Sequence, residues 1–197
     1  MQSKKTRSNQ ERTEATRTAL LSAARKLFVE KGYAATSTPE IAAAADITRG
    51  ALYHHFTDKQ DLFRAILEDE ARAVAREIEL AAPDALPVRA ALIAGSEAYL
   101  AAMTVPGRTR LLLIDGPAVL GTEAIFALDA AHAGRTLREG LAMAVGDGLP
   151  SGTPVDALAA LLSAAFDRTA LAIASGADAS AFRAAMIGMI ERTVAPS

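Results

Sequence analysis

The sequence predicts an all-α protein of about nine helices, and three observations support this fold class. Alanine, the residue with the highest helix propensity, is abundant. Apolar residues recur at spacings of three and four, and strand-length runs of β-branched residues are hard to find. The 197 residues are 51% hydrophobic and 22% charged, which is typical of a soluble globular protein and excludes a disordered chain.

The first part of the chain carries clear helix start and stop signals. A helix is expected over 9–31, with Gly32 as its C-terminal stop. Asp46 is expected in a tight turn, because Asp tolerates the left-handed conformation. Thr48 is then a natural N-cap for a short helix over Arg49–His55. Three capping boxes, each a Ser or Thr followed three residues later by Glu or Gln, are expected at helix starts: Ser8–Glu11, Ser37–Glu40 and Thr57–Gln60.

Beyond residue 60 the pattern stays helical, and the long helix opened at Thr57 carries an apolar stripe and ends before Pro83. Proline and glycine mark the later boundaries. We expect a helix from Pro87 to about Met103, chain breaks at 105–107 and 115–117, and a helix from Thr122 to near Gly146. The next helix is expected to have Thr153 as its N-cap and Pro154 as its first residue, and to end at Gly176. A last helix is expected to be capped by Asp178.

Charge divides the chain unevenly. Residues 1–60 hold five lysines, five arginines and six acidic residues, a net charge of +4. Residues 61–197 hold eleven arginines and seventeen acidic residues, a net charge of −6. This asymmetry indicates a basic module that meets a polyanion, joined to an acidic body. We therefore expect two domains, 1–60 and 61–197.

Several function classes lack their motifs. The chain has no cysteine, so disulfides, thiolate zinc sites and cysteine nucleophiles are excluded. No nucleophile elbow, phosphate loop or zinc-protease motif is found, and Gly146-x-Gly148 has no preceding strand. We expect no enzyme activity, no metal and no cofactor. A polar start and short apolar stretches such as 158–166 predict a cytoplasmic protein without a membrane span.

Two short helices joined by a tight turn, over residues 37–55, predict a helix-turn-helix. In that motif the N-terminal residues of the second helix face base edges in the major groove. Leu52 and Phe56 are one turn apart and are expected to face inward, whereas Arg49, Tyr53 and His54 face outward. Arg49 is suited to guanine or phosphate, and Gly50 allows close backbone approach.

One stretch of the sequence resembles the N-terminal domain of the TetR family. It consists of Gly32-Tyr33-Ala34-Ala35-Thr36-Ser37, then Ile41-Ala42, then Asp46 to Phe56, then Asp58-Lys59 and Leu62. The resemblance covers about residues 10–65. It implies a homodimer that binds a double-stranded operator of inverted symmetry and is released by a small molecule. It implies DNA contacts at these positions, to which we add Ser37: Thr36, Ser37, Thr48, Arg49, Gly50, Tyr53, His54 and Lys59. Pro39 stands where relatives often carry a polar or basic residue.

A structural role remains the alternative at several positions. His54, His55 and Tyr53 are also consistent with packing at the end of a short helix, and Thr48 with capping alone. His132 is also consistent with a solvated surface position. A transcriptional activator, or a DNA-binding protein that needs no ligand, fits the same motif.

The resemblance extends these expectations to the rest of the chain. The last two helices are expected to form the dimer interface through Leu158, Leu161, Leu162, Ala165, Thr169, Phe182, Met186, Met189 and Ile190. The middle helices are expected to enclose an effector pocket, with an ordinary core as the alternative for each residue. The pocket candidates are Tyr99, Met103, Leu111, Ile114, Asp115, Phe126, His132, Met143 and Phe166.

Overall fold

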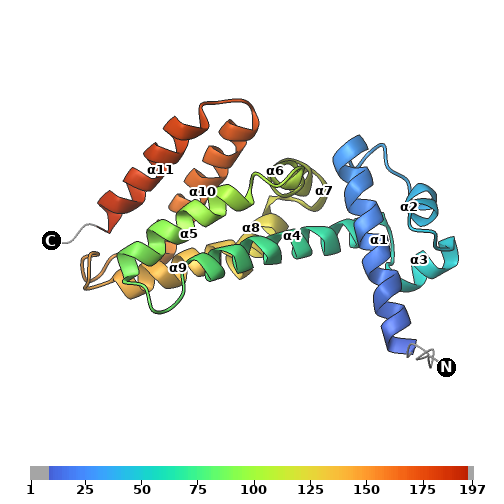
Figure 1. Ribbon diagram of the computed structural model, residues 1–197, viewed down its shortest axis with the longest axis horizontal. Coiled ribbons are helices and arrows are strands. Elements are labelled where there is room, and N and C mark those ends of the chain that lie inside the picture. Colours follow the sequence, from blue (N-terminus) through green and yellow to red (C-terminus); the bar gives the residue numbers. More distant parts are fainter. Residues whose placement is uncertain (1–8, 195–197) are drawn as a thin grey trace, which may run out of the picture. The chain divides into compact units, whose positions relative to one another are not determined.

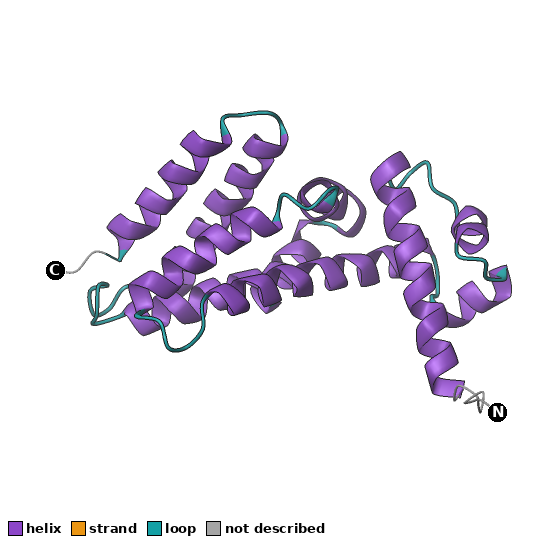
Figure 2. Cartoon of the chain, viewed as in Figure 1, coloured by secondary structure: helices purple, strands orange, loops and turns teal. Residues whose placement is uncertain are grey.

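The computed structural model describes residues 9–194, and over this range the chain is helical, with one isolated bridge between Val145 and Leu149 (Figures 1 and 2). The predicted all-α class is confirmed. The segments, in chain order, are α1 (Asn9–Lys31), α2 (Thr38–Ala44), α3 (Arg49–His55), α4 (Lys59–Ala81), α5 (Val88–Ala102), α6 (Arg108–Arg110), the π-helical η1 (Leu111–Asp115), α7 (Gly116–Leu120), α8 (Thr122–Ala131), α9 (Ala133–Ala144), α10 (Val155–Ala174) and α11 (Ala179–Thr193).

The chain divides into two compact units, residues 1–67 and 68–197, whereas the sequence analysis placed the boundary at residue 60. The division falls inside α4, because the first turns of this helix supply core residues to the first unit. Leu62, Phe63 and Leu67 are fully buried there. The Phe63 ring lies edge-on to Phe28 of α1, with ring centroids 5.2 Å apart.

Local signals set the helix ends of the first unit as expected. The Ser37 hydroxyl accepts the Glu40 N–H, and the Thr48 hydroxyl accepts the Ala51 N–H at 3.2 Å. Asp46 takes φ 55°, the left-handed conformation predicted for the turn. Ser8 lies outside the described residues. The reciprocal half of the Ser37–Glu40 box differs from expectation, because the Glu40 carboxylate pairs with Lys31 instead.

The cap of α4 lies one residue later than predicted. Asp58 Oδ1 accepts the Asp61 N–H at 2.8 Å, and Asp61 Oδ2 accepts the Thr57 N–H at 2.9 Å. Asp58 therefore replaces Thr57 as the N-cap, and Asp61 reaches back to the residue before the cap. Aspartate caps at least as well as threonine, and a carboxylate near the N-terminus also interacts favourably with the helix dipole.

The second unit is a layered helical body. Helix α5 packs against α9 and α11, and α10 packs against the same two helices. Its fully buried side chains include Leu111, Leu141 and Ile190. The predicted ends of α5 and α10 hold within a residue or two, but Pro87 and Pro154 are the N-cap residues of these helices rather than their first residues. The Thr153 hydroxyl donates to the Pro150 carbonyl instead of capping α10.

Two predicted boundaries between 108 and 146 are wrong. The chain does not break at 115–117, because η1 winds as a π-helix and the Gly116 N–H bonds the Leu111 carbonyl, so the helical path continues through Pro117. The predicted helix from Thr122 to Gly146 is split at His132, whose φ and ψ are −125° and −102°. A Cβ at position 134 would lie 3.0 Å from the Asp129 carbonyl oxygen, a close backbone approach that favours Gly134.

Helix α10 is long and apolar enough to cross a membrane by length and composition, with a mean hydropathy of 1.5. The helix contains Asp167 and Arg168 and packs against α5, α9 and α11. One third of its apolar window is buried, so the helix packs one face against the helical body.

A buried ion-pair network fixes α4 to the segment after α5 within the second unit. Arg108 is 6% exposed, and its Nε donates to Glu70 Oε2 at 2.7 Å. One terminal nitrogen of the same guanidinium donates to Glu77 Oε1 at 3.0 Å and to the Ala102 carbonyl at 2.8 Å. The charge is thus fully partnered, as a buried arginine requires.

Replacing Arg108 with Met should lower the free energy of unfolding by about 3 kcal/mol, because the buried Glu70 carboxylate loses its cation. Urea unfolding measures this change. The control is Arg72→Met, which removes an exposed arginine paired with Glu68 and Asp69 and should cost less than about 1 kcal/mol. Equal losses in the two variants would contradict a structural role for the buried network.

Candidate nucleic-acid interface and cavity

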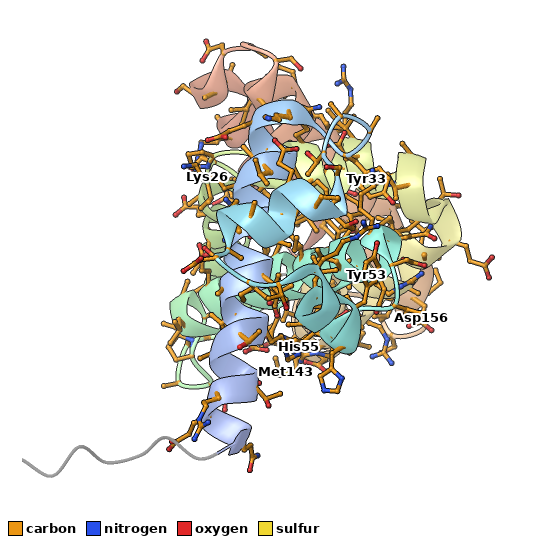
Figure 3. All side chains as sticks on the ribbon, turned by 90° about the vertical axis from the view of Figure 1, so that its right-hand side faces the viewer. Lys26, Tyr33, Tyr53, His55, Met143 and Asp156 are labelled. Carbon is orange, nitrogen blue, oxygen red and sulfur yellow. The ribbon has the colours of Figure 1, made fainter. Side chains whose placement is uncertain are left out.

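The first unit presents one polar surface built from α2, the turn and α3. Ser37, Thr48, Arg49, Gly50 and His54 are exposed. Tyr53 is 44% exposed, although it is a large aromatic residue (Figure 3). These six of the eight predicted DNA-contacting residues therefore lie open to solvent on neighbouring elements.

The apolar face of helix α3 packs into the core of the first unit. Leu52 is fully buried and Phe56 is 2% exposed, as the helical spacing predicted. On the outer face the Tyr53 hydroxyl is 3.0 Å from the Thr38 hydroxyl, which ties α3 to the start of α2. The Arg49 guanidinium lies 5.8 Å from the centre of the Tyr53 ring. The two outward side chains are thus positioned before any partner binds.

The pKa of Tyr53 is held below its usual value, first by the hydrogen bond with Thr38 and then by the neighbouring Arg49.

Gly50 lies between Arg49 and Tyr53 in the chain, and a Cβ built there would meet nothing within 4 Å. The fold therefore does not require glycine at this position. The missing side chain leaves room at the surface for close approach of another molecule.

Thr36 and Lys59 are held inside the first unit rather than presented on this surface. Thr36 is 1% exposed, and its hydroxyl lies 2.9 Å from the Gly32 carbonyl and 3.3 Å from that of Leu27. The Lys59 ammonium donates to the carbonyls of Tyr33 (2.9 Å) and Thr36 (3.0 Å) and lies over the Tyr33 ring. Both residues fasten the connection between α1 and α2.

The two adjacent histidines differ in exposure. His54 is exposed, whereas His55 is half-buried and its burial lowers the pKa of its imidazole. Their ring centroids are 5.7 Å apart. His55 is therefore a packing residue, and His54 alone belongs to the exposed surface.

The second unit contains two neighbouring cavities of about 690 Å³ and 400 Å³. Cavity A, the larger, is lined by the pocket candidates Tyr99, Met103, Phe126 and His132. Cavity B, the smaller, is lined by Tyr99, Met143 and Phe166. The two cavities share four wall residues: Tyr99, Asp129, Ala133 and Ser163.

Three pocket candidates line neither cavity. Leu111 is fully buried in the core, Ile114 is 54% exposed, and Asp115 lies 3.2 Å from Arg110 Nε. The π-helical winding of η1 changes which residues face the interior, so a regular helical pattern misplaced them. His132 is not the solvated residue of the alternative interpretation, since its Nε2 is 2.9 Å from Glu68 Oε1 and only 15% of its side chain is exposed.

Sequence reasoning missed the carboxylates of the cavity wall, Asp129 and Asp167. Asp167 Oδ1 accepts a 2.6 Å hydrogen bond from the Tyr99 hydroxyl, and Asp129 Oδ2 accepts one of 2.7 Å from Ser163. Burial raises the pKa of Asp167 to about 6 and raises that of Tyr99 well above its usual value. The only sequence signal was the presence of aspartates among apolar residues of helical segments.

The predicted dimer residues divide between two environments. Leu162, Thr169, Met186 and Ile190 are buried within the unit, because α10 and α11 pack on each other. Leu158 and Ala165 are half-buried. Three large apolar side chains remain open: Leu161 (70% exposed), Phe182 (36%) and Met189 (42%).

These two units, one with an exposed helix-turn-helix and one with partly open cavities, are those of a helix-turn-helix transcriptional regulator. A family model described as bacterial regulatory proteins of the tetR family matches residues 20–66. A second, described as the tetracyclin repressor-like C-terminal domain, matches residues 89–196. The chain belongs to the TetR family.

Individual relatives agree with this assignment. A TetR-family regulator of known structure from Pectobacterium atrosepticum is 31% identical, with 94% of each chain covered and a TM-score of 0.71. A structure from Syntrophomonas wolfei, described as that of a TetR-family regulator, has the same fold at 16% identity, with 90% of this chain and 94% of that chain covered and a TM-score of 0.77. The transcriptional regulator AcrR of Shigella flexneri is 47% identical over 62 residues, which span 32% of this chain and 29% of AcrR. The curated relatives are thus matched over about a third of their length.

Thr36→Val should lower the free energy of unfolding by about 1–2 kcal/mol, because the hydroxyl that serves the Leu27 and Gly32 carbonyls is lost without a change of shape. Chemical denaturation measures the loss. Thr18→Val makes the same change at an exposed position of α1 and should have an effect under about 0.5 kcal/mol. A Thr36 variant with unchanged stability but weakened DNA binding would instead assign Thr36 to the interface.

Asp167→Asn should stabilise the ligand-free protein at pH 7.5 by up to about 3 kcal/mol, since the pKa of Asp167 rises from 3.8 to about 6 on folding. A raised carboxyl pKa means that ionisation destabilises the fold above pH 6, and this penalty disappears as the pH falls from 6 towards 4. Unfolding curves from pH 4 to 8 measure the difference. A gap between the two proteins that stays constant over this range would show that Asp167 is not the titrating group.

Proposed function

We propose that this protein is a ligand-responsive repressor that binds an inverted-repeat operator as a homodimer and is released by a small molecule. Residues 1–60 act as the DNA-binding domain, and residues 61–197 act as the ligand-binding and dimerisation domain. The observation that carries the proposal is the exposed outer face of α3, where Arg49, Gly50 and Tyr53 stand on a helix anchored by buried Leu52 and Phe56.

In this proposal α3 enters the major groove. Arg49 donates a pair of hydrogen bonds to guanine O6 and N7, or holds a phosphate, and Tyr53 donates its hydroxyl to a phosphate. The absence of a side chain at Gly50 lets the backbone approach the DNA. Ser37 and Thr48 supply hydroxyls at helix starts, where backbone N–H groups also favour phosphate. Thr36 and Lys59 support this surface indirectly by holding the connection between α1 and α2.

A symmetric operator requires two copies of α3 about 34 Å apart, and therefore a dimer. The exposed apolar residues Leu161, Phe182 and Met189 of α10 and α11 support this assignment, since such side chains on adjacent helices mark an association surface. Ala185 and Gly188 on α11 permit close helix approach.

Release follows from a two-state equilibrium. Ligand in the cavities favours a spacing of the two α3 helices that no longer fits successive grooves, and the coupling is reciprocal, about 1–3 kcal/mol. Helix α4 supports this path, because it begins in the DNA-binding unit and its residues Ala71, Val74 and Ile78 line the cavities. A promoter–reporter assay with and without the gene separates a repressor from an activator on the same scaffold.

Arg49→Ala should weaken binding to the DNA upstream of the gene about 10- to 100-fold, because a paired contact to guanine is lost. Fluorescence anisotropy across a salt series measures the affinity, and wild type should bind with two subunits per site and a steep salt dependence. Arg76→Ala removes the same charge from an exposed position in the second unit and should change the affinity less than threefold, about 0.6 kcal/mol. Equal weakening by both variants would mean that only net charge matters and that α3 reads no base.

A further inference from the structure

The walls of the two cavities are apolar surfaces interrupted mainly by acidic groups. Cavity B has no lysine, arginine or histidine in its wall, within the described part of the chain. Cavity A has two basic residues, Arg138 and His132. The acidic wall residues of the two cavities together are Glu79, Asp84, Asp129, Glu139, Asp156 and Asp167.

The basic residues near these walls are already engaged. Arg138 Nε lies 3.0 Å from Asp156, and His132 bonds Glu68. Arg135, which lies outside both walls, serves Glu79 and Glu139. These ion pairs involve Glu79, Glu139 and Asp156, and of the other three acidic wall residues Asp84 is exposed, which leaves Asp129 and Asp167.

Asp129 and Asp167 receive only neutral hydrogen bonds. The donors are the Ser163 and Tyr99 hydroxyls, and over residues 9–194 neither carboxylate lies within 4.0 Å of a basic nitrogen. Asp129 faces both cavities, and Asp167 faces the larger one. Two carboxylates without a cation, in partly buried positions, normally cost stability unless a positive charge joins them.

The effect of Asp129 on Asp167 also indicates that a positive charge would be favoured near these two carboxylates. The negative charge of Asp129 adds to burial in raising the pKa of Asp167. The same negative potential favours any other cation placed near both carboxylates. The adjoining wall provides aromatic faces as well, since the Tyr99 and Phe166 rings meet edge to face at 5.3 Å and Phe126 stands in the wall of cavity A.

We propose that these cavities bind an organic cation, with an apolar body held in the apolar space and its positive centre at Asp129 and Asp167. This inference deepens the proposed function by naming the chemical class of the effector, and it rests on that function only in taking the cavities as the effector site. The combined volume suits a molecule of drug size. The same charges disfavour a carboxylate or phosphate effector at this point of the wall, because it would meet two partly buried carboxylates.

The test uses two probes of the same shape and opposite charge, tetraphenylphosphonium and tetraphenylborate, in sodium buffer. Isothermal titration calorimetry on the full chain without DNA gives both affinities. Wild type should bind the cation at least tenfold more tightly than the anion. The double variant Asp129→Asn/Asp167→Asn keeps the shape of both side chains and should lose at least tenfold in cation affinity without losing anion affinity.

The matched control is Asp147→Asn, which removes an exposed acid that lines neither cavity and should leave both affinities unchanged. Circular dichroism melts establish that each variant is folded. Equal affinity of wild type for the two ions, no binding of the cation, or a double variant that retains cation affinity would each overturn the inference.

A parallel anisotropy titration of the protein–DNA complex with tetraphenylphosphonium keeps this inference separate from the proposed function. Carboxylate-dependent cation binding with unchanged DNA affinity supports the inference and contradicts release by ligand. Specific DNA binding by a protein that ignores the cation overturns the inference and leaves the DNA-binding proposal standing.

Discussion

One helix, α4, must bury a face in the cores of two units, and the rest of the structure depends on this constraint. The part of α4 in the first unit buries Leu62, Phe63 and Leu67 in that unit's core. The part in the second unit buries Val74 and Ile78. The apolar stripe therefore continues over 23 residues at helical spacing. In the second unit Arg108 holds the same helix through Glu70 and Glu77. Each half of the helix is thus held by buried contacts within its own unit.

In the first unit the polar side chains serve two different purposes. Thr36 and Lys59 bond backbone carbonyls and close the connection after α1, with the Thr36 hydroxyl buried and two acceptors for the Lys59 ammonium inside the fold. Arg49 and Tyr53 are oriented by each other and by Thr38, yet remain exposed. Side chains that are ordered in advance lose less conformational entropy when they bind. Family resemblance alone treats all of these positions as DNA contacts, and the hydrogen bonds separate the two groups.

The second unit keeps groups that a purely structural core would avoid. Asp129 and Asp167 face cavities without a basic residue paired to them, and the burial of Asp167 opposes its ionisation. A cavity also forgoes the dispersion contacts that a filled core would make. Such costs are expected where a site is reserved for a ligand that supplies the missing charge and the missing contacts.

The sequence by itself determined the features that depend on near neighbours in the chain. The all-α class, the turn at Asp46, the caps at Ser37, Thr48 and Asp178, and the inward face of α3 all follow from local propensity and helical spacing. Even there, adjacent equivalent groups made the position of a cap ambiguous, as at Thr57 and Asp58.

Tertiary structure decided what depends on residues far apart in sequence. The break at His132, the π-helical winding of η1, the internal role of Lys59 and the pairing of Tyr99 with Asp167 have no local signal. Tyr99 and Asp167 are 68 residues apart, and whether such a carboxylate is solvated, paired or left facing a cavity depends on which helices pack around it. Hydrogen bonding and desolvation act through space, so these properties became visible only when the chain was folded.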